Sequence, residues 1–133
     1  MSSIDKALGA IPAAAAIQAR RLEIVAGNIA NVSTPKYKAR DLDFRQVMAT
    51  LAQDGAASAT PAARTAELQR ANPQVFDPDN PNADDNGYVY RSNVNPLEEM
   101  TDMLEAARSY ESALSTASTA RELMMRTLDL NTK

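Results

Sequence analysis

The N-terminal region carries a regular heptad pattern of apolar positions. The spacing alternates between four and three residues, and the eight positions are Ile4, Leu8, Ile11, Ala15, Gln18, Leu22, Val25 and Ile29. Only Gln18 is polar. Such spacing is typical of the packing face of a coiled-coil-like helix. The pattern predicts a helix over residues 4–31, about 40 Å long at 1.5 Å per residue.

Pro12 and Gln18 complicate this helix. Pro12 has no backbone N–H and clashes with the preceding turn, so we expect the helix either to kink or to begin there. Gln18 places an amide on the apolar face. We interpret it as an edge position; the alternative is a polar contact that sets the register with a partner helix.

The helix ends in the stretch "NIANVSTPKYKARDLDF", residues 28–44. The amides of Asn28 and Asn31 can satisfy the last backbone carbonyls of the helix, or tolerate left-handed geometry. Thr34-Pro35 then favours extended backbone, because proline restricts the residue before it. Apolar and charged residues are interleaved up to Phe44. This pattern predicts a linker with a short strand.

The middle of the chain has little regular patterning. "RQVMATLAQ" (45–53) predicts one or two helical turns at most, and "GAASATPAARTAE" (55–67) has too few bulky side chains to bury much area, so we expect it to be flexible. Residues 72–90 are rich in Pro, Asn, Asp and Gly, which form turns. We expect an extended, turn-rich segment that ends in a short strand at "GYVYR".

The C-terminal region predicts a second, longer helix. Asn95 can cap it, Pro96 suits the first helical position, and Glu98 occupies the third, where a capping box needs an acid. No residue breaks the pattern up to Leu130, about 50 Å further on. One apolar stripe contains Met103, Ala106, Tyr110, Ala113, Ala117, Ala120 and Met124. A neighbouring stripe contains Met100, Leu104, Ala107, Leu114, Met125 and Leu128.

These elements predict a mainly α fold. We expect the two terminal helices to pair as an antiparallel coiled-coil-like hairpin, with an extended, partly flexible middle that carries little β structure. The sequence thus divides the chain into an N-terminal stacking helix (1–31), an extended middle with short β segments (32–94) and a C-terminal stacking helix (95–133). Pairing leaves apolar area uncovered, mainly on the C-terminal helix, and such stripes normally mark a partner surface. The pattern indicates a subunit that completes its core by assembly.

Composition and charge exclude several classes of protein. The 133-residue chain has a net charge of −3, which argues against nucleic-acid binding. It has no Cys and no His, so thiolate chemistry and most zinc sites are absent. No apolar run is long enough to predict a membrane span. "DPDNPNADDNG" (77–87) lacks the ligand spacing of an EF-hand. We predict no catalytic, cofactor or metal site and no small-molecule substrate.

Two stretches resemble the family of bacterial flagellar rod and hook proteins. In "LEIVAGNIANVSTPKYKARDLDF" (22–44), the residues that match the N-terminal signature are Asn28, Ala30, Asn31, Thr34, Pro35 and Tyr37. The stretch 77–130 resembles the C-terminal half of a proximal rod protein, through 93–95 ("NVN"), 98–100 ("EEM") and 107–110 ("ARSY"). "YKARDLDF" is also similar to a sister rod protein. Lys36 stands where many members have Gly, which argues against a turn with positive φ.

The resemblance implies a non-enzymatic subunit of the flagellar basal-body rod in the periplasmic space. Its terminal helices would stack with copies of itself and with other rod subunits, forming a hollow shaft that transmits torque and passes exported subunits. Export would use the flagellar type III apparatus, without a cleavable signal peptide. An intracellular helical adaptor or chaperone-like binding module is the alternative. The residues expected to pack between subunits are Leu8, Ile11, Leu22, Val25, Ile29, Met100, Met103, Leu104, Tyr110, Leu114, Met124 and Leu128.

Overall fold

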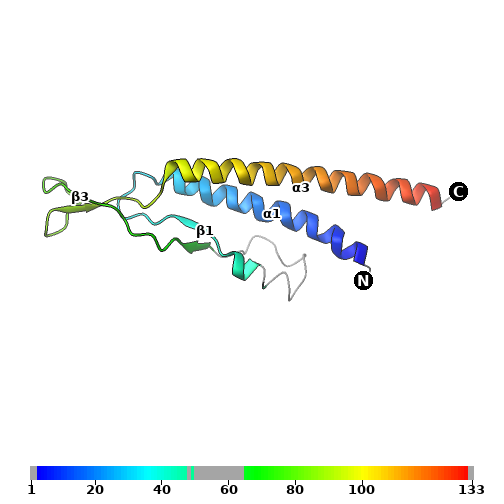
Figure 1. Cartoon of the computed structure of the whole chain (residues 1–133), viewed down its shortest axis with the longest axis horizontal. Coiled ribbons are helices and arrows are strands. Elements are labelled where there is room, and N and C mark those ends of the chain that lie inside the picture. Colours follow the sequence, from blue (N-terminus) through cyan, green and yellow to red (C-terminus); the bar gives the residue numbers. More distant parts are fainter. Residues whose placement is uncertain (1–2, 48, 50–64, 132–133) are drawn as a thin grey trace.

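Two long helices dominate the computed structural model, which describes residues 3–47, 49 and 65–131, with side chains from residue 10 to residue 130. Helix α1 spans Ser3–Ala30 and helix α3 spans Pro96–Asn131. They lie side by side, with both chain ends at one end of the molecule and the β3 region at the other (Figure 1). The prediction of a mainly α fold is confirmed.

Helix α1 contains Pro12 in its interior. The helix runs unbroken from Ser3, so the alternative that it begins at Pro12 is wrong. An interior proline costs about 3 kcal/mol. The flanking sequence offsets this cost, because alanine has the highest helix propensity. Ala13 and Ala15 are also buried, so tertiary packing holds this turn in place.

Small side chains bring α1 and α3 close together. Ala106 of α3 is completely buried, and Val25 of α1 is nearly so. Met103, Tyr110 and Ala113, from the same stripe of α3 as Ala106, are half-buried. This part of the stripe therefore faces α1. The large side chains of the neighbouring stripe stay exposed: Met100, Leu104, Leu114, Met125 and Leu128.

Four short strands make up two separate two-stranded sheets. Strand β1 (Arg40–Leu42) pairs antiparallel with β2 (Thr65–Glu67), with Asp41 opposite Ala66. Strand β3 (Gln74–Phe76) pairs antiparallel with β4 (Tyr88–Tyr90), with Val75 opposite Val89. The expected strands in the linker and at "GYVYR" are confirmed. The expectation of flexibility is wrong for residues 65–67, because backbone pairing with β1 orders them.

The β3–β4 hairpin depends on Gly87. This residue has φ of +80°, and a Cβ there would lie 2.9 Å from the Phe76 ring. The ring also contacts Tyr88 edge-to-face, with centroids 5.3 Å apart. Glycine is therefore required for both the backbone conformation and the close approach of the ring.

The middle of the chain, which the sequence predicts to be extended and partly flexible, contributes to the core. Strand β1 packs on α1, and the buried side chains of this region are Ala39, Leu42, Val47, Val89 and Val94. Residues 44–47 form a helical turn, as the sequence predicts. Residue 48 and residues 50–64 lie outside the described residues, and they include the rest of the stretch 55–67 that was expected to be flexible.

Candidate assembly surface and the polar junction beside it

Asn28 forms a buried polar junction between α1, β1 and α3. Its side chain is 1% exposed. The amide nitrogen donates to the Arg40 carbonyl at 2.7 Å and to Glu99 Oε2 at 3.0 Å. The amide oxygen accepts from the Arg40 N–H at 2.9 Å and the Tyr37 hydroxyl at 3.1 Å. All four hydrogen-bonding positions of the amide are used. The prediction that Asn28 caps the end of α1 is therefore wrong.

Asn31 has the helix-ending role that the sequence predicts. Its amide nitrogen donates to the Gly27 carbonyl at 2.8 Å, within the last turn of α1. Its amide oxygen accepts from the Thr34 hydroxyl at 3.1 Å. This bond links the helix end to the Thr34-Pro35 turn. Ala30 is the last residue of α1.

Lys36 adopts the left-handed conformation, with φ of +60°. The sequence argued against a positive φ here, and that expectation is wrong. The surroundings of Lys36 explain how a residue with a Cβ tolerates it. Its N–H donates to the Tyr90 carbonyl at 3.0 Å, and the next N–H, of Tyr37, donates to the Thr34 carbonyl at 3.3 Å. The side chain is exposed. Backbone bonds on both sides thus over-determine the turn.

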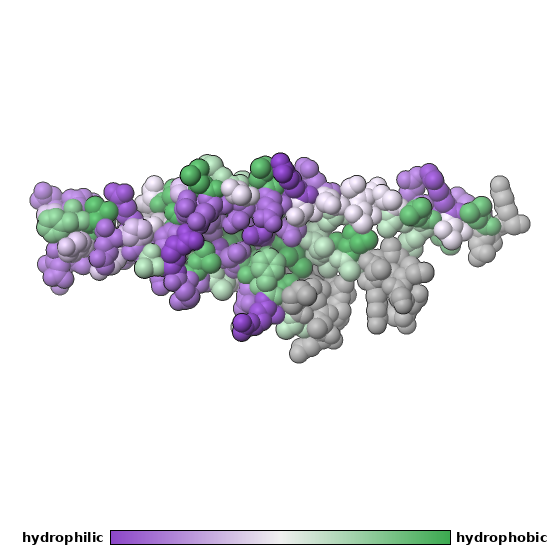
Figure 2. Space-filling view, in the orientation of Figure 1, coloured by the Kyte–Doolittle hydropathy of each residue, from purple (hydrophilic) through white to green (hydrophobic). Residues whose placement is uncertain are grey.

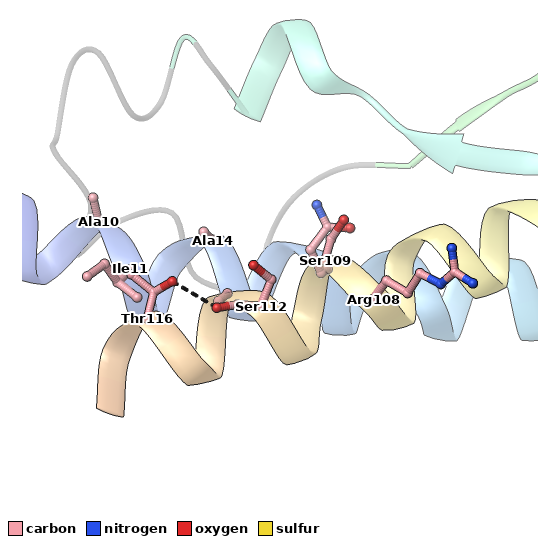
Figure 3. Close-up of a pocket in the computed structure, with 9 residues that line it drawn as sticks. Ala10, Ile11, Ala14, Arg108, Ser109, Ser112 and Thr116 are labelled. Carbon is pink, nitrogen blue, oxygen red and sulfur yellow. Dashed lines mark hydrogen bonds between the residues drawn. The ribbon is translucent and has the colours of Figure 1, made fainter. Parts of the chain in front are cut away.

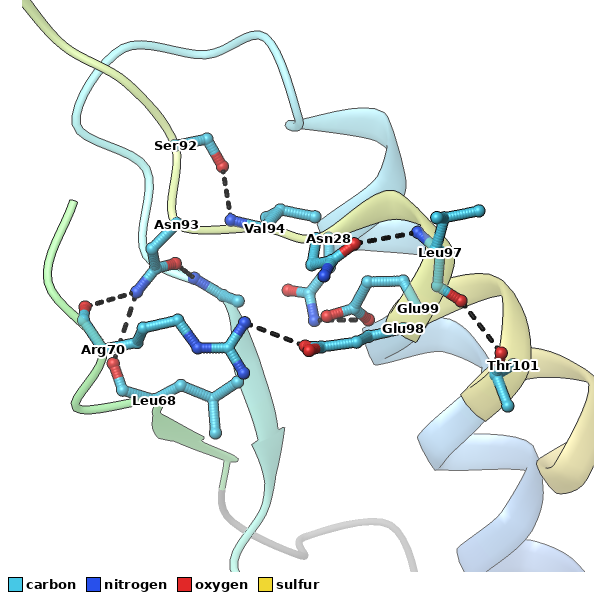
Figure 4. Close-up of polar contacts among 12 residues, drawn as sticks. Asn28, Leu68, Arg70, Ser92, Asn93, Val94, Leu97, Glu98, Glu99 and Thr101 are labelled. Atoms are coloured by element: carbon cyan, nitrogen blue, oxygen red, sulfur yellow. Dashed lines mark hydrogen bonds and ion pairs between the residues drawn. The ribbon is translucent and has the colours of Figure 1, made fainter. Parts of the chain in front are cut away.

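Asn93 joins the segments that lead into and out of the strands. It is 4% exposed, and its amide oxygen accepts from the Ala39 N–H at 2.6 Å. Its amide nitrogen donates to the Arg70 carbonyl at 2.7 Å (Figure 4). Asn72 makes a similar link, donating to the carbonyls of Tyr37 at 2.8 Å and Arg91 at 2.7 Å. Together with Asn28, these two asparagines supply hydrogen bonds to backbone groups that lie outside the regular pairing of the two sheets.

Glu99 is a buried carboxylate in the first turn of α3, 5% exposed. Burial raises its pKa above the ordinary 4.5, while the hydrogen bond from Asn28 lowers it. The neighbouring acids Asp102, Asp41 and Glu98 raise the pKa further. Arg21 lies 3.8 Å from Asp41 and 3.6 Å from Asp102, and so offsets part of this negative charge.

Helix α3 begins at Pro96, and Asn95 Oδ1 accepts from the Leu97 N–H at 3.1 Å. Glu98 does not complete a capping box. Its carboxylate instead pairs with Arg70 at 2.8 Å, joining the start of α3 to the segment after β2 (Figure 4). Arg70 follows β2, which the sequence pattern did not reveal, so this competing partner could not be foreseen.

The expected packing residues divide into two groups. Ile11, Leu22, Val25, Ile29, Met103 and Tyr110 are half-buried or buried. Met100, Leu104, Leu114, Met124 and Leu128 remain exposed on α3, by 44% to 59%. Figure 2 shows hydrophobic patches along the α3 edge of the molecule, separated by hydrophilic ones. The side chain of Leu8 lies outside the described residues. The chain therefore has an apolar face that its own fold leaves uncovered.

A groove of about 570 Å³ runs along the other flank of the helix pair (Figure 3). Four residues of α1 and five of α3 line it: Ala10, Ile11, Ala14, Gln18, Arg108, Ser109, Ser112, Ala113 and Thr116. Gln18 lies at this margin of the contact, as expected for an edge position, and its side-chain oxygen is buried without a hydrogen-bond partner among the described residues.

The part of the chain that the structure describes offers little for chemistry. It contains no group of three or more His, Cys, Asp or Glu residues placed to hold a metal ion. In the 77–87 stretch, Asp84 Oδ1 instead accepts from the backbone N–H groups of Asn86 and Tyr88, which shapes a turn. None of the described helices is both long and apolar enough to cross a membrane.

Sequence reasoning found the residues of the junction without finding their roles. Asn28, Tyr37 and Asn93 all belong to the stretches that resemble the rod and hook family. Their roles depend on contacts across 9 to 71 positions of sequence, which periodicity cannot reveal. The one available signal was the number of asparagines, because a buried amide is costly unless the fold satisfies it.

Comparison with known proteins agrees with the resemblance. The profile of the family "Flagella basal body rod protein" matches residues 13–38, and that of "Flagellar basal body rod FlgEFG protein C-terminal" matches residues 85–130. The flagellar basal-body rod protein FlgC of Salmonella typhimurium is 35% identical over 123 residues, which cover 88% of this chain and 90% of the relative.

Two further relatives carry the same name. FlgC of Buchnera aphidicola is 31% identical over 124 residues, covering 86% of this chain and 88% of the relative. FlgC of Bacillus subtilis is 26% identical over 129 residues, covering 83% and 86%. These relatives favour the proximal rod protein indicated by the C-terminal stretch over its sister. The chain belongs to the FlgC family of flagellar basal-body rod proteins.

Proposed function

We propose that the chain is a structural subunit of the bacterial flagellar basal-body rod. The observation that carries this proposal is the uncovered apolar face of α3 in a member of a rod-protein family. Exposed stripes of this length cost free energy in a lone subunit, at about 25 cal/mol per Å² of apolar surface. Assembly with other rod subunits and with copies of the same chain removes this cost.

In this proposal α1 and α3 act together as one antiparallel coiled-coil-like hairpin. Asn28, near the end of α1, contacts Glu99 at the start of α3, and Arg21 lies beside Asp102. These contacts support opposite chain directions. The hairpin, residues 1–31 with 95–133, stacks in the wall of the shaft, and residues 32–94 face outward. The twelve packing residues, Leu8 among them, make the contacts between helices and between subunits.

The rest of the proposal follows from the family. The assembled rod transmits torque and leaves a channel for exported subunits. It lies in the periplasmic space, and its subunits reach it through the flagellar type III export apparatus. No step of this function requires a cofactor, a nucleic acid, insertion into a membrane or a catalytic residue.

The test compares two substitutions of Leu114 in cells that lack their own copy of the subunit. Leu114 is 47% exposed, so Leu114→Asp leaves the fold of the isolated chain intact, as circular dichroism can check. In the rod it buries an unpaired charge, so we expect motility and rod assembly to be lost. Leu114→Met keeps the volume and apolar character, and we expect normal swimming.

Leu22→Asp tests α1 in the same way, because Leu22 is half-buried in the helix pair. We expect this variant also to abolish motility, here with some loss of helix in the isolated chain. Normal swimming of the Leu114→Asp cells would contradict the proposal. Loss of swimming with Leu114→Met as well would show that the assay reports general damage at the site and not apolar packing.

A further inference from the structure

A cleft of about 330 Å³ lies between the turn that ends α1 and the β3–β4 hairpin. Residues of the turn 32–35 line one side of it. Asn80 and Asn82 of the hairpin loop (residues 77–86) and the segment 89–92 line the rest. Its volume lies within the range of binding pockets, about 300–1,000 Å³, and its lining combines apolar and polar side chains. The cleft is therefore large enough to receive part of another protein.

The cleft offers positive charge and hydrogen-bond donors. Arg91 lines it and is exposed, and Lys36, also exposed, directly follows the lining residue Pro35. Within the described part of the chain, neither basic side chain takes part in an ion pair. The Ser92 hydroxyl lines the cleft and accepts from the Val94 N–H at 3.1 Å, so its own proton remains to donate (Figure 4). No acidic residue of the described chain lines the cleft, which therefore favours a partner that carries carboxylates.

The hairpin loop of the same chain carries such carboxylates. Its charged residues are four Asp, with no Lys or Arg. Asp77 and Asp84 accept hydrogen bonds from groups within the hairpin. Asp79 and Asp85 are exposed and lie outside the cleft lining, and in the described part of the chain their carboxylates have neither a hydrogen bond nor an ion pair. These two carboxylates, with the 63% exposed Phe76 ring beside them in the hairpin, are available to a partner.

The shape of the molecule brings the loop of one copy within reach of the cleft of another. The hairpin projects beyond the helix pair, at the end opposite both chain termini (Figure 1). A second copy placed alongside and shifted along the long axis presents its loop to the cleft at the base of the first hairpin. Because the two surfaces differ, each copy uses its loop on one neighbour and its cleft on another. Such head-to-tail contacts build an open helical assembly.

We propose that, in the assembled rod, the cleft of each copy receives the acidic hairpin loop of a neighbouring copy. Asp79 and Asp85 of the loop pair with Lys36 and Arg91 at the cleft. An Arg guanidinium binds a carboxylate through two parallel hydrogen bonds, and partial enclosure in the cleft reduces the screening by salt that weakens exposed pairs. This inference rests on the proposed rod function and names a contact that the outward-facing region makes.

The first test uses the absence of cysteine from the chain. Cells that lack their own copy express two full-length variants with different tags, Ser33→Cys in the cleft and Asp85→Cys in the loop. Oxidation of intact basal bodies should give a disulfide-linked dimer that carries both tags, which shows that the link joins two copies. As a control, Glu67→Cys, at an exposed acid on β2, replaces Asp85→Cys and should give no such dimer.

The outcomes separate this contact from the rod function. Basal bodies that contain the chain but give no mixed dimer, or as much of it with Glu67→Cys, overturn the contact and leave the rod function standing. Linkage of Asp85→Cys to a different rod protein also overturns it, because the loop then docks on another partner. Basal bodies without the chain overturn the rod function and this contact with it.

The second test exchanges the charges of one pair. Asp85→Arg brings two positive groups together, and Arg91→Asp brings two negative groups together, so we expect each variant to reduce rod assembly and swimming. The double variant Asp85→Arg/Arg91→Asp restores opposite charges and should recover swimming. Glu67→Arg makes the same change of charge away from the contact and should swim normally. Normal swimming with either single variant, or a double variant that swims no better than the single ones, overturns the pairing.

Discussion

Replacing Asn28 by Ala tests the polar junction most severely. The substitution removes one hydrogen bond to the Tyr37 hydroxyl, two to the backbone of Arg40 and one to the Glu99 carboxylate. A neutral hydrogen bond contributes about 1 kcal/mol and one to a charged group about 1.5–3 kcal/mol. Because these partners are then left without the amide, we expect the free energy of unfolding to fall by about 4 kcal/mol. That is a large part of the 5–15 kcal/mol typical of a domain.

The assay is urea unfolding followed by far-ultraviolet circular dichroism, with Asn31→Ala as the control. Asn31 belongs to the same sequence motif but bonds only within the helix end and the next turn. Its loss should therefore cost about 1 kcal/mol, as for other capping residues. Hydrogen exchange supplies a local readout, because the Arg40 amide bonded to Asn28 should lose protection. If both variants lost the same small amount of stability, the buried hydrogen bonds of Asn28 would not be a major source of stability for the fold.

Three further substitutions test separate features. Burial raises the pKa of Glu99, so the folded state holds this proton more tightly than the unfolded chain does. Protonated Glu99 therefore stabilises the folded state fully below pH 4.5, and this stabilisation is lost as the pH rises through the folded pKa. Glu99→Gln should make the free energy of unfolding in urea less dependent on pH in that window. An unchanged pH profile would contradict the raised pKa. Lys36→Gly should raise the free energy of unfolding by about 1 kcal/mol by relieving the positive φ, and a loss of stability would count against the strain. Asn95→Ala removes the bond to the Leu97 N–H, so the free energy of unfolding should fall by about 1 kcal/mol and the melting temperature should fall with it. An unchanged melting temperature would show that Asn95 does not cap the helix.

The two helices could be predicted from the sequence because their information is local. The heptad of residues 4–29 and the two apolar stripes between residues 100 and 128 each repeat over several turns, so a single irregular residue such as Pro12 or Gln18 does not hide them. Asn95 and Pro96 likewise mark the start of α3 through chemistry that acts within one turn. The uncovered apolar area followed from comparing the widths of the two apolar faces.

Strands β2 and β3 and the junction could not be predicted because they depend on contacts with residues far away in the sequence. Strand β2 is three residues long, and its partner β1 lies more than twenty positions earlier in the chain. Asn28 looked like a helix-ending residue, since the sequence does not show that β1 and Glu99 close over it. Lys36 was misjudged for a similar reason. Its left-handed backbone is held by the Tyr90 carbonyl, which belongs to β4.

The central claim is that the helix pair α1 and α3 builds the wall of a rod. An electron cryo-microscopy map of intact basal bodies from cells that carry this chain tests it most directly. The account predicts two adjacent helical densities, matching residues 3–30 and 96–131, in the inner wall of the rod, with the strands further out. A rod without density for this chain, or with its helices on the outside and the strands facing the channel, would contradict the account.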